Sequence, residues 1–302
     1  MPVVYKFSKM PAYQKTYAEM KRNFEENIAC LKRGGTTAFV RAPIMSTTET
    51  VIMGQSQLIQ HYNALNYYEE NDEKVLVKYN FIQRWLHDPA RRTVCNVVCE
   101  PDNTDRTVMN IWMPFRASRF DAVVQPEQIL NKILGFASSA YDNADELLRF
   151  FAYTVQYPNT KLPYILAIVG DDWYTSSILV HFFGQMVVGP YLYKRLYKFE
   201  SKERIGQKLL SVDSAQNAMA VKEIWGEYMT PGHSSNDTTW FIQNKANIIM
   251  TTDETFEDEN FRVIQCTKNA LNLTQIESYL NSTIAARCFY DYLMLMNLPT
   301  LP

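Results

Sequence analysis

The residues with the clearest chemical potential follow an apolar run, PYILAIVG, that ends at Gly170. An uninterrupted run of this kind is typical of a strand buried on both faces of a parallel sheet. A strand, a glycine, a short loop and a helix form the layout of a phosphate-binding loop, in which a lysine reaches the outer phosphates and a hydroxyl holds Mg²⁺. Here Thr175 stands at the second glycine, Ser176 at the lysine and Ser177 at the hydroxyl position. The segment therefore has the layout of such a loop without its cation.

The other residues of this loop are unfavourable for a nucleotide. Asp171 and Asp172 would place carboxylates beside triphosphate oxygens, and Trp173 and Tyr174 are bulky where a backbone must wrap closely. The two carboxylates could instead bind a metal ion or act as an acid–base pair, although solvated loop acids are commoner. An ordinary strand-to-helix turn would also explain the segment taken alone.

Three more short apolar runs follow in the sequence. They are QKLLSVD, which ends at Asp213, ANIIMTTD, which ends at Asp253, and FRVIQCT, which begins at Phe261. Helical or irregular segments separate them, and this alternation predicts an α/β fold with a mainly parallel central sheet. The acidic residues over 253–259 could chelate a divalent ion, although a solvated acidic loop is the commoner arrangement.

The N-terminal part of the chain has a different character. Residues 12–33 have apolar residues at helical spacing before two glycines, which predicts a helix ending at Gly34. Residues 36–53 predict a hairpin, and residues 94–113 predict two strands. We expect an N-terminal α+β accessory lobe over 1–120, a helical linker region over 121–160 and the α/β core over 161–302.

Basic residues gather after the predicted helix of the loop, with tyrosines between them. The basic residues are Lys194, Arg195, Lys198, Lys202 and Arg204, and the tyrosines are Tyr191, Tyr193 and Tyr197. Such a cluster can contact a nucleic-acid backbone while its aromatic rings stack on bases. A solvated helix face is the alternative. The cluster predicts a nucleic-acid contact.

The bulk composition predicts a globular protein of a reducing compartment. The formal net charge of −2 excludes a surface coated all over by nucleic acid but allows a local basic strip. The five cysteines and four histidines lack metal-ligand spacing, so we expect reduced thiols, no bound metal and a cytoplasmic location, in a host cell or a viral replication compartment. No apolar run is long enough to span a membrane, and we expect no membrane partner.

The order of these segments resembles the superfamily 3 helicase domains of phage and large-virus primase-helicases, including phage primase-polymerases with a fused helicase. Such proteins have a tryptophan-leucine pair, a proline-arginine patch and an asparagine-tryptophan pair upstream of the loop. The segments WLHDPARR over 85–92 and NIW over 110–112 are similar. The resemblance extends from about Thr36 to Asn269 and implies a P-loop NTPase-like core.

The resemblance also implies roles for the later motifs. In the family, a second strand ends in an acidic pair that positions Mg²⁺ and the attacking water. Here Asp213 remains and Ser214 replaces the second acid. A third strand ends in an asparagine that senses the γ-phosphate, and Asp253 stands in its place.

The arginine motif is changed as well. The family's arginines precede the final strand, and one of them acts across a subunit boundary. The corresponding residues are Glu259 and Asn260, and Arg262 lies beyond them. All four motifs thus lack a decisive residue. Loss of the loop lysine alone should reduce the rate by orders of magnitude, because this catalysis is mostly charge stabilisation.

We therefore expect a catalytically degenerate superfamily 3 helicase-like protein of a virus or mobile element. It would bind nucleic acid or protein in DNA replication and use no cofactor. DNA is the expected nucleic-acid partner. The family's active members form rings, so the resemblance also implies a homo-oligomer or a hetero-oligomer with an active helicase. The degenerate motif positions are Gly170, Ser176, Ser177, Asp213 and Asp253.

Two alternatives remain open at this point. The first is a working helicase that uses ATP and magnesium, in which Lys208 or Lys222 replaces the missing lysine. The second is an α/β interaction protein unrelated to helicases. A fold in which the three core motifs do not lie on adjacent central strands would favour the second alternative.

Overall fold

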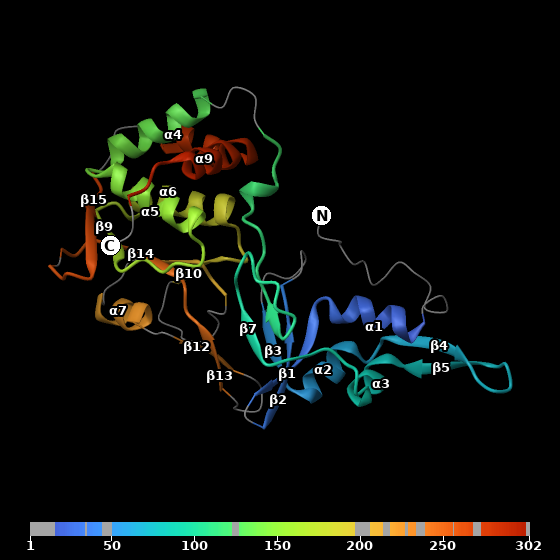
Figure 1. Cartoon of the computed structure of the whole chain (residues 1–302). Coiled ribbons are helices and arrows are strands. Elements are labelled where there is room, and N and C mark those ends of the chain that lie inside the picture. Colours follow the sequence, from blue (N-terminus) through green and yellow to red (C-terminus); the bar gives the residue numbers. More distant parts are fainter. Residues whose placement is uncertain are drawn as a thin grey trace. The chain divides into compact units, whose positions relative to one another are not determined.

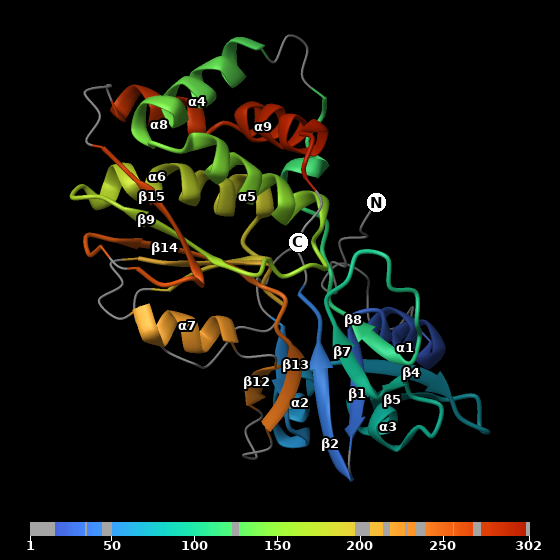
Figure 2. The same cartoon turned by 60° about the vertical axis from the view of Figure 1, so that its left-hand side comes forward.

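The computed structural model describes residues 16–33, 35–43, 50–122, 127–196, 206–213, 218–226, 229–233, 239–255, 257–267 and 273–299. The chain divides into two compact units (Figures 1 and 2). Unit 1 comprises Met1–Ile111 with Pro231–Ile242, and unit 2 comprises Trp112–Thr230 with Gln243–Pro302. The divide thus precedes residue 120, the expected end of the accessory lobe, and the expected linker helices belong to unit 2.

Unit 1 contains a four-stranded sheet in the order β3-β2-β1-β6. Its strands are β1 (Ile28–Arg33), β2 (Thr36–Arg41), β3 (Val51–Met53) and β6 (Thr93–Val94). β1, β2 and β3 pair antiparallel, whereas β6 runs parallel to β1. The hairpin expected over 36–53 is confirmed by the pairing of β2 with β3.

The expected helix over 12–33 is wrong in its second half. Helix α1 (Tyr17–Glu25) begins at a capping box on Thr16, and residues 28–33 form β1 instead. β1 pairs with β2 along its whole length, which places Ile28 and Cys30 in the same core as Phe24. Strand pairing and burial therefore outweigh the helical spacing of this segment.

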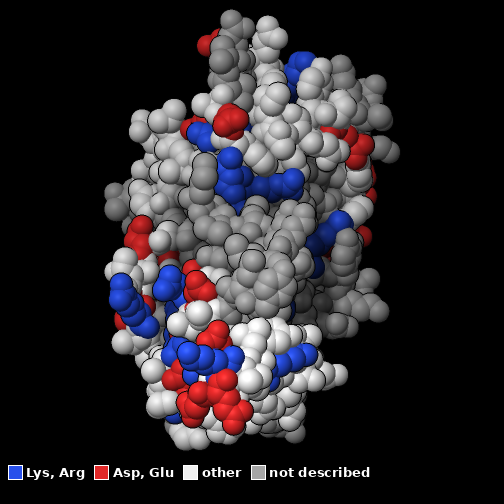
Figure 3. Space-filling model, turned by 90° about the vertical axis from the view of Figure 1, so that its right-hand side faces the viewer, with Lys and Arg blue, Asp and Glu red and all other residues white. Residues whose placement is uncertain are grey.

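The other elements of unit 1 are two helices and three two-stranded pairs. They are α2 (Gln55–Tyr62), α3 (Phe81–His87), β4 (Asn66–Glu70) with β5 (Leu76–Asn80), β7 (Asn96–Val98) with β8 (Val108–Asn110), and β12 (Met229–His233) with β13 (Thr239–Gln243). The β4–β5 hairpin carries acidic and basic side chains interleaved, and Figure 3 shows this mixture on the face that carries the hairpin.

The upstream segment WLHDPARR has a structural role in unit 1. Trp85 is fully buried and donates from Nε1 to Glu25 over 2.8 Å. Asp88 accepts from Tyr17 and from Lys21, each over 2.7 Å, and these bonds join the end of α3 to α1. The hydrogen bonds from Lys21 and Tyr17 lower the pKa of Asp88 to about 2. The segment thus holds the core of unit 1 together.

Unit 2 is built on a five-stranded sheet in the order β10-β11-β14-β9-β15. The strands are β9 (Ile165–Val169), β10 (Tyr193–Leu196), β11 (Leu209–Val212), β14 (Asn247–Thr252) and β15 (Phe261–Gln265). All neighbours run parallel. Every residue of β9, β11 and β14 is buried, as expected for central strands with both faces covered. The predicted α/β fold with a parallel sheet is confirmed.

Helices cover both faces of this sheet. α4 (Glu127–Ala140), α5 (Ala144–Gln156), α6 (Trp173–Phe182), α8 (Leu273–Leu280) and α9 (Thr283–Leu295) gather on one side, and α7 (Ala218–Gly226) lies on the other (Figure 2). A short 3₁₀ helix, η2 (Ala117–Arg119), precedes α4, and a π-helical segment, η3 (Phe183–Val188), continues α6. No helix among the described residues is long and apolar enough to cross a membrane.

Candidate functional site

Three strands with motif-like ends lie side by side at the centre of the unit 2 sheet. β14 pairs with β11 on one side and with β9 on the other. Because the strands are parallel, Gly170, Asp213 and Asp253 all follow their strands at the same edge, the carboxyl edge. Ligands of open α/β sheets bind at this edge. The structure therefore brings these three predicted positions to one place.

The connection after β9 is a tight turn. β9 ends at Val169 and α6 begins at Trp173. A Cβ atom on Gly170 would lie 2.8 Å from the carbonyl oxygen of Cys266 and 2.8 Å from Ser176 Oγ, so a side chain has no space here. Asp172 is the N-cap of α6 and accepts from the Tyr174 amide over 3.2 Å. A side-chain cap thus occupies the helix N-terminus, where a phosphate would otherwise bind.

The hydroxyl residues of the expected loop are buried inside α6. Thr175, Ser176 and Ser177 are each at most 1% exposed. Thr175 donates to the Asp172 carboxylate, Ser176 donates to the Asp172 carbonyl over 3.0 Å, and Ser177 donates to the Tyr174 carbonyl over 3.4 Å. Their hydroxyls are therefore used within the helix, at the positions that would contact phosphate and Mg²⁺ in a phosphate-binding loop.

Asp213 is held in a buried network that contains an arginine, a histidine and two hydroxyls. Arg195 of β10 donates from Nε to its carboxylate, and His181 Nε2 of α6 lies 3.3 Å from Oδ2. Ser211 and Thr251 donate to Oδ1 over 3.2 and 3.4 Å. Burial acts to raise the pKa of Asp213, but His181 and Arg195 outweigh it, and the pKa is lowered overall. Both oxygens of this ionised carboxylate thus have protein partners.

Trp173 packs against Arg195 and His181 of this network. The guanidinium carbon of Arg195 lies 4.9 Å from the centroid of the Trp173 ring, and the His181 ring centroid lies 6.2 Å from it. An arginine over an indole face is stabilised by the ring's quadrupole. The first residue of α6 therefore helps to hold Arg195 on Asp213.

The remaining acids of the carboxyl edge face solvent. Asp171, Asp253 and Glu254 are exposed. Their negative charge repels phosphates at the edge where a nucleotide would lie. Among the described residues, no group of three or more histidine, cysteine or acidic side chains could hold a metal ion.

The two lysines considered as replacements for the missing loop lysine lie at the opposite, amino edge of the sheet. Lys208 immediately precedes β11, is buried, and has its Nζ 5.6 Å from the centroid of the Trp112 ring. Lys222 of α7 donates to Asp258 over 2.9 Å, and Asp258 precedes β15. Both ammonium groups therefore lie away from Gly170.

The arginine beyond the expected arginine motif also belongs to the amino edge. Glu259 and Asn260 precede β15, and Arg262 is its second residue. Arg262 donates to Glu146 of α5 over 2.5 Å, and its guanidinium carbon lies 3.9 Å from the centroid of the Tyr164 ring. An ion pair and an aromatic contact thus hold it within unit 2.

The part of the predicted basic cluster that the structure describes falls on a strand. Lys194 and Arg195 lie in β10, where Arg195 contacts Asp213, and Tyr193 of the same strand is buried. Lys198, Lys202 and Arg204 lie outside the described residues. Among the described residues of the cluster, Lys194 therefore remains as the candidate for a basic strip on the surface.

The pairing of Arg195 with Asp213 was not predicted from the sequence. The register of β10 and β11 places Arg195 beside Ser211, two residues before Asp213. A basic residue in a strand parallel to the acid-ending strand is the only signal in the sequence, and it has meaning only once the two strands are known to pair. His181 joins them from a third element, α6.

Comparisons with known proteins give a fold relationship. No protein-family model and no curated protein sequence matches the chain. The A form apo structure of the NrS-1 C-terminal region is similar, with a TM-score of 0.62 and 13% identity over 92% of this chain and 69% of that chain. Another apo structure of that region, covering residues 305–718, has a TM-score of 0.59 and 14% identity, with the same two coverages of 92% and 69%. The chain thus shares the fold of the NrS-1 C-terminal region.

Proposed function

We propose that this chain is a catalytically degenerate superfamily 3 helicase-like protein of a virus or mobile element, and that it acts as a nucleic-acid- or protein-binding module in DNA replication. The observation that carries the proposal is that protein side chains already occupy the Asp213 carboxylate. This residue stands where the family's Mg²⁺-positioning acid stands, and Arg195 and His181 hold it instead.

The arrangement of the strands supports a P-loop NTPase-like core. β9, β14 and β11 are adjacent, and their carboxyl ends carry the positions that resemble the family's first, third and second motifs. A fold without these positions on adjacent strands would have favoured an α/β protein unrelated to helicases, and here the three strands are adjacent. The fold shared with the NrS-1 C-terminal region agrees with this assignment.

The chemistry of the carboxyl edge supports the loss of ATPase activity. A Mg²⁺ ion at Asp213 would have to displace Arg195 from a carboxylate that is 2% exposed. The α6 terminus is capped by Asp172, and the contacts of Lys208 and Lys222 hold both side chains at the other edge of the sheet.

An active helicase with an atypical loop has less support. That alternative needs Lys208 or Lys222 beside the phosphates, and both lie at the amino edge of the sheet. The proposed binding role leaves the ATPase edge unused and relies on other surfaces. Oligomerisation with itself or with an active helicase remains part of the proposal, through the resemblance to ring-forming proteins.

The proposal is tested by two titrations of the purified protein. In the first, unfolding is followed with ATP and Mg²⁺, and we expect no stabilisation, whereas saturation at about 100 times the Kd would add about 2.7 kcal/mol. In the second, a labelled single-stranded oligonucleotide is followed by fluorescence anisotropy, and we expect binding that weakens with salt. Stabilisation by ATP and Mg²⁺ would overturn the proposal in favour of the active alternative.

A further inference from the structure

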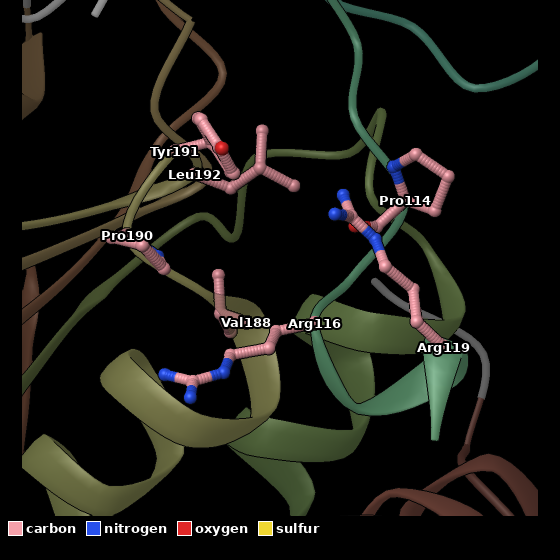
Figure 4. Close-up of a pocket in the computed structure, with 7 residues that line it drawn as sticks. All are labelled: Pro114, Arg116, Arg119, Val188, Pro190, Tyr191 and Leu192. Carbon is pink, nitrogen blue, oxygen red and sulfur yellow. The ribbon is translucent and has the colours of Figure 1, made fainter. Parts of the chain in front are cut away.

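A small pocket lies in unit 2 beside η2, away from the residues of the carboxyl edge. It has a volume of about 140 Å³ and is lined by Pro114, Arg116, Arg119, Val188, Pro190, Tyr191 and Leu192 (Figure 4). None of these residues is acidic. Two arginines therefore line a space that contains no carboxylate from its own walls.

The two arginines have neutral partners. Arg119 Nη2 donates to the Pro114 carbonyl over 2.7 Å, and Arg116 Nη1 donates to the Gln185 carbonyl over 3.2 Å. Arg119 Nε is buried and has no hydrogen-bond partner. An anionic ligand bound to the accessible part of the guanidinium would provide the missing countercharge.

The close-up indicates which arginine would bind such a ligand directly. In Figure 4 the Arg119 guanidinium points into the space between Pro114 and Leu192, whereas the Arg116 guanidinium points away from Arg119. Arg119 is therefore placed to contact the ligand, and Arg116 adds positive potential from the side of the pocket.

The pocket is built rigidly. Gly189 has φ +95, and a Cβ atom on it would lie 2.8 Å from Cβ of Arg116, so η2 packs directly against the turn after η3. The Arg116 amide also donates to the Val188 carbonyl over 3.2 Å. From α9, Arg287 donates to the carbonyls of Ser118 and Phe120 over 3.3 and 2.7 Å. A preorganised site of this kind loses little entropy when a ligand binds.

We propose that this pocket binds one phosphate group, with Arg119 as its main ligand. The volume suits a compact anion, since pockets for whole drug-sized ligands measure roughly 300–1,000 Å³. Phosphate oxygens match the donor fork of a guanidinium, and the apolar walls of Val188 and Leu192 strengthen the attraction by excluding water. In this protein the phosphate belongs to single-stranded nucleic acid, an assignment that rests on the proposed function, and Tyr191 provides an aromatic wall beside it.

The test uses the full chain and three charge-matched variants, Arg119→Gln, Arg116→Gln and Arg149→Gln. Glutamine keeps a donor for the Pro114 carbonyl, and Arg149 is exposed on α5 and does not line the pocket. Binding of a labelled oligothymidine of about 20 nucleotides is measured by anisotropy over a range of salt concentrations. Thermal stability is measured in inorganic phosphate and in chloride at equal ionic strength.

We expect Arg119→Gln to weaken binding about tenfold, Arg116→Gln to weaken it less, and Arg149→Gln to leave it unchanged. The slope of log K against log salt should fall by about 0.7 in Arg119→Gln, the value for one phosphate contact on a single strand. Equal affinities and slopes in Arg119→Gln and Arg149→Gln would overturn the pocket and leave the proposed function intact.

A different pattern separates the two sources of phosphate. Stabilisation by inorganic phosphate that Arg119→Gln removes, in a protein that does not bind the oligonucleotide, would support the pocket with a free phosphate as ligand and contradict the nucleic-acid part of the proposed function. Absence of both responses would overturn the pocket.

Discussion

Two arginines of unit 2 occupy opposite electrostatic situations. Arg195 forms an ion pair with the buried Asp213 carboxylate at the carboxyl edge of the sheet, and its guanidinium packs against the Trp173 ring. Arg119 lies in a pocket without acids and donates only to a carbonyl. At the carboxyl edge, Arg195 is thus paired with Asp213 and the exposed side chains are acidic. The pocket beside η2 is lined by two arginines and by no acid. The charge of Arg195 at the carboxyl edge is therefore paired within the protein, whereas Arg119 has only a neutral acceptor and could attract an anion.

We expect the largest difference between the two sites when each arginine is replaced in turn and the free energy of unfolding is compared. Arg195→Gln removes the arginine from the buried Asp213 carboxylate and leaves it with His181, Ser211 and Thr251, and we expect a loss of about 3 kcal/mol in the free energy of unfolding. Arg119→Gln breaks no ion pair and should change it by about 0.5 kcal/mol or less. Urea denaturation of the two variants measures both values. Equal losses would contradict the contrast between the two sites.

The rigidity of the pocket can be tested at Gly189. Gly189→Ala introduces a side chain at φ +95 and places it against Cβ of Arg116, and we expect a loss of about 1–3 kcal/mol. Gly135→Ala is the matched control, because Gly135 lies within α4 with nothing near its added Cβ, and alanine there should stabilise by about 0.4–1 kcal/mol. Denaturant midpoints of both variants give the comparison. A harmless Gly189→Ala would mean that η2 can move away from the turn.

Acidification should act on the carboxyl edge and have little effect on the pocket. The pKa of Asp213 is lowered in the folded state, so its ionised form stabilises the protein above its unfolded pKa of about 4. This contribution is lost as the pH falls below about 4 towards the folded pKa. The stability difference between the parent and Asp213→Asn should therefore shrink over that range. A difference that stays constant on acidification would show that Asp213 is not ionised in the folded protein.

The central strands could be predicted from the sequence, but the contacts between them could not. The runs ending at Gly170, Asp213 and Asp253 predicted β9, β11 and β14 because fully buried strands have few polar residues. β10 was missed because its four residues, YKRL, are amphipathic and short. Residues 28–33 were mistaken for helix because the spacing of their apolar residues fits both a helix and a strand. The pairing with β2 decides for the strand.

The sites themselves depend on tertiary structure. The pocket joins residues 114–119 to residues 188–192, and only the fold brings these two segments together. The Asp213 network similarly combines β10, β11, β14 and α6. The sequence alone showed that Thr175 and Ser176 stand where a phosphate-binding loop has glycine and lysine. Their burial inside α6 follows from the early start of that helix at Trp173, which the resemblance to a longer loop concealed.

The most direct test of the central claim is ATP hydrolysis by the purified full chain, measured with Mg²⁺ in the presence and absence of single-stranded DNA. Asp213→Ala serves as the matched variant, since it removes the acid that the resemblance assigns to positioning the metal. We expect no turnover above background in either protein, because Arg195 and His181 already hold that acid. Turnover in the parent that disappears in Asp213→Ala would contradict it.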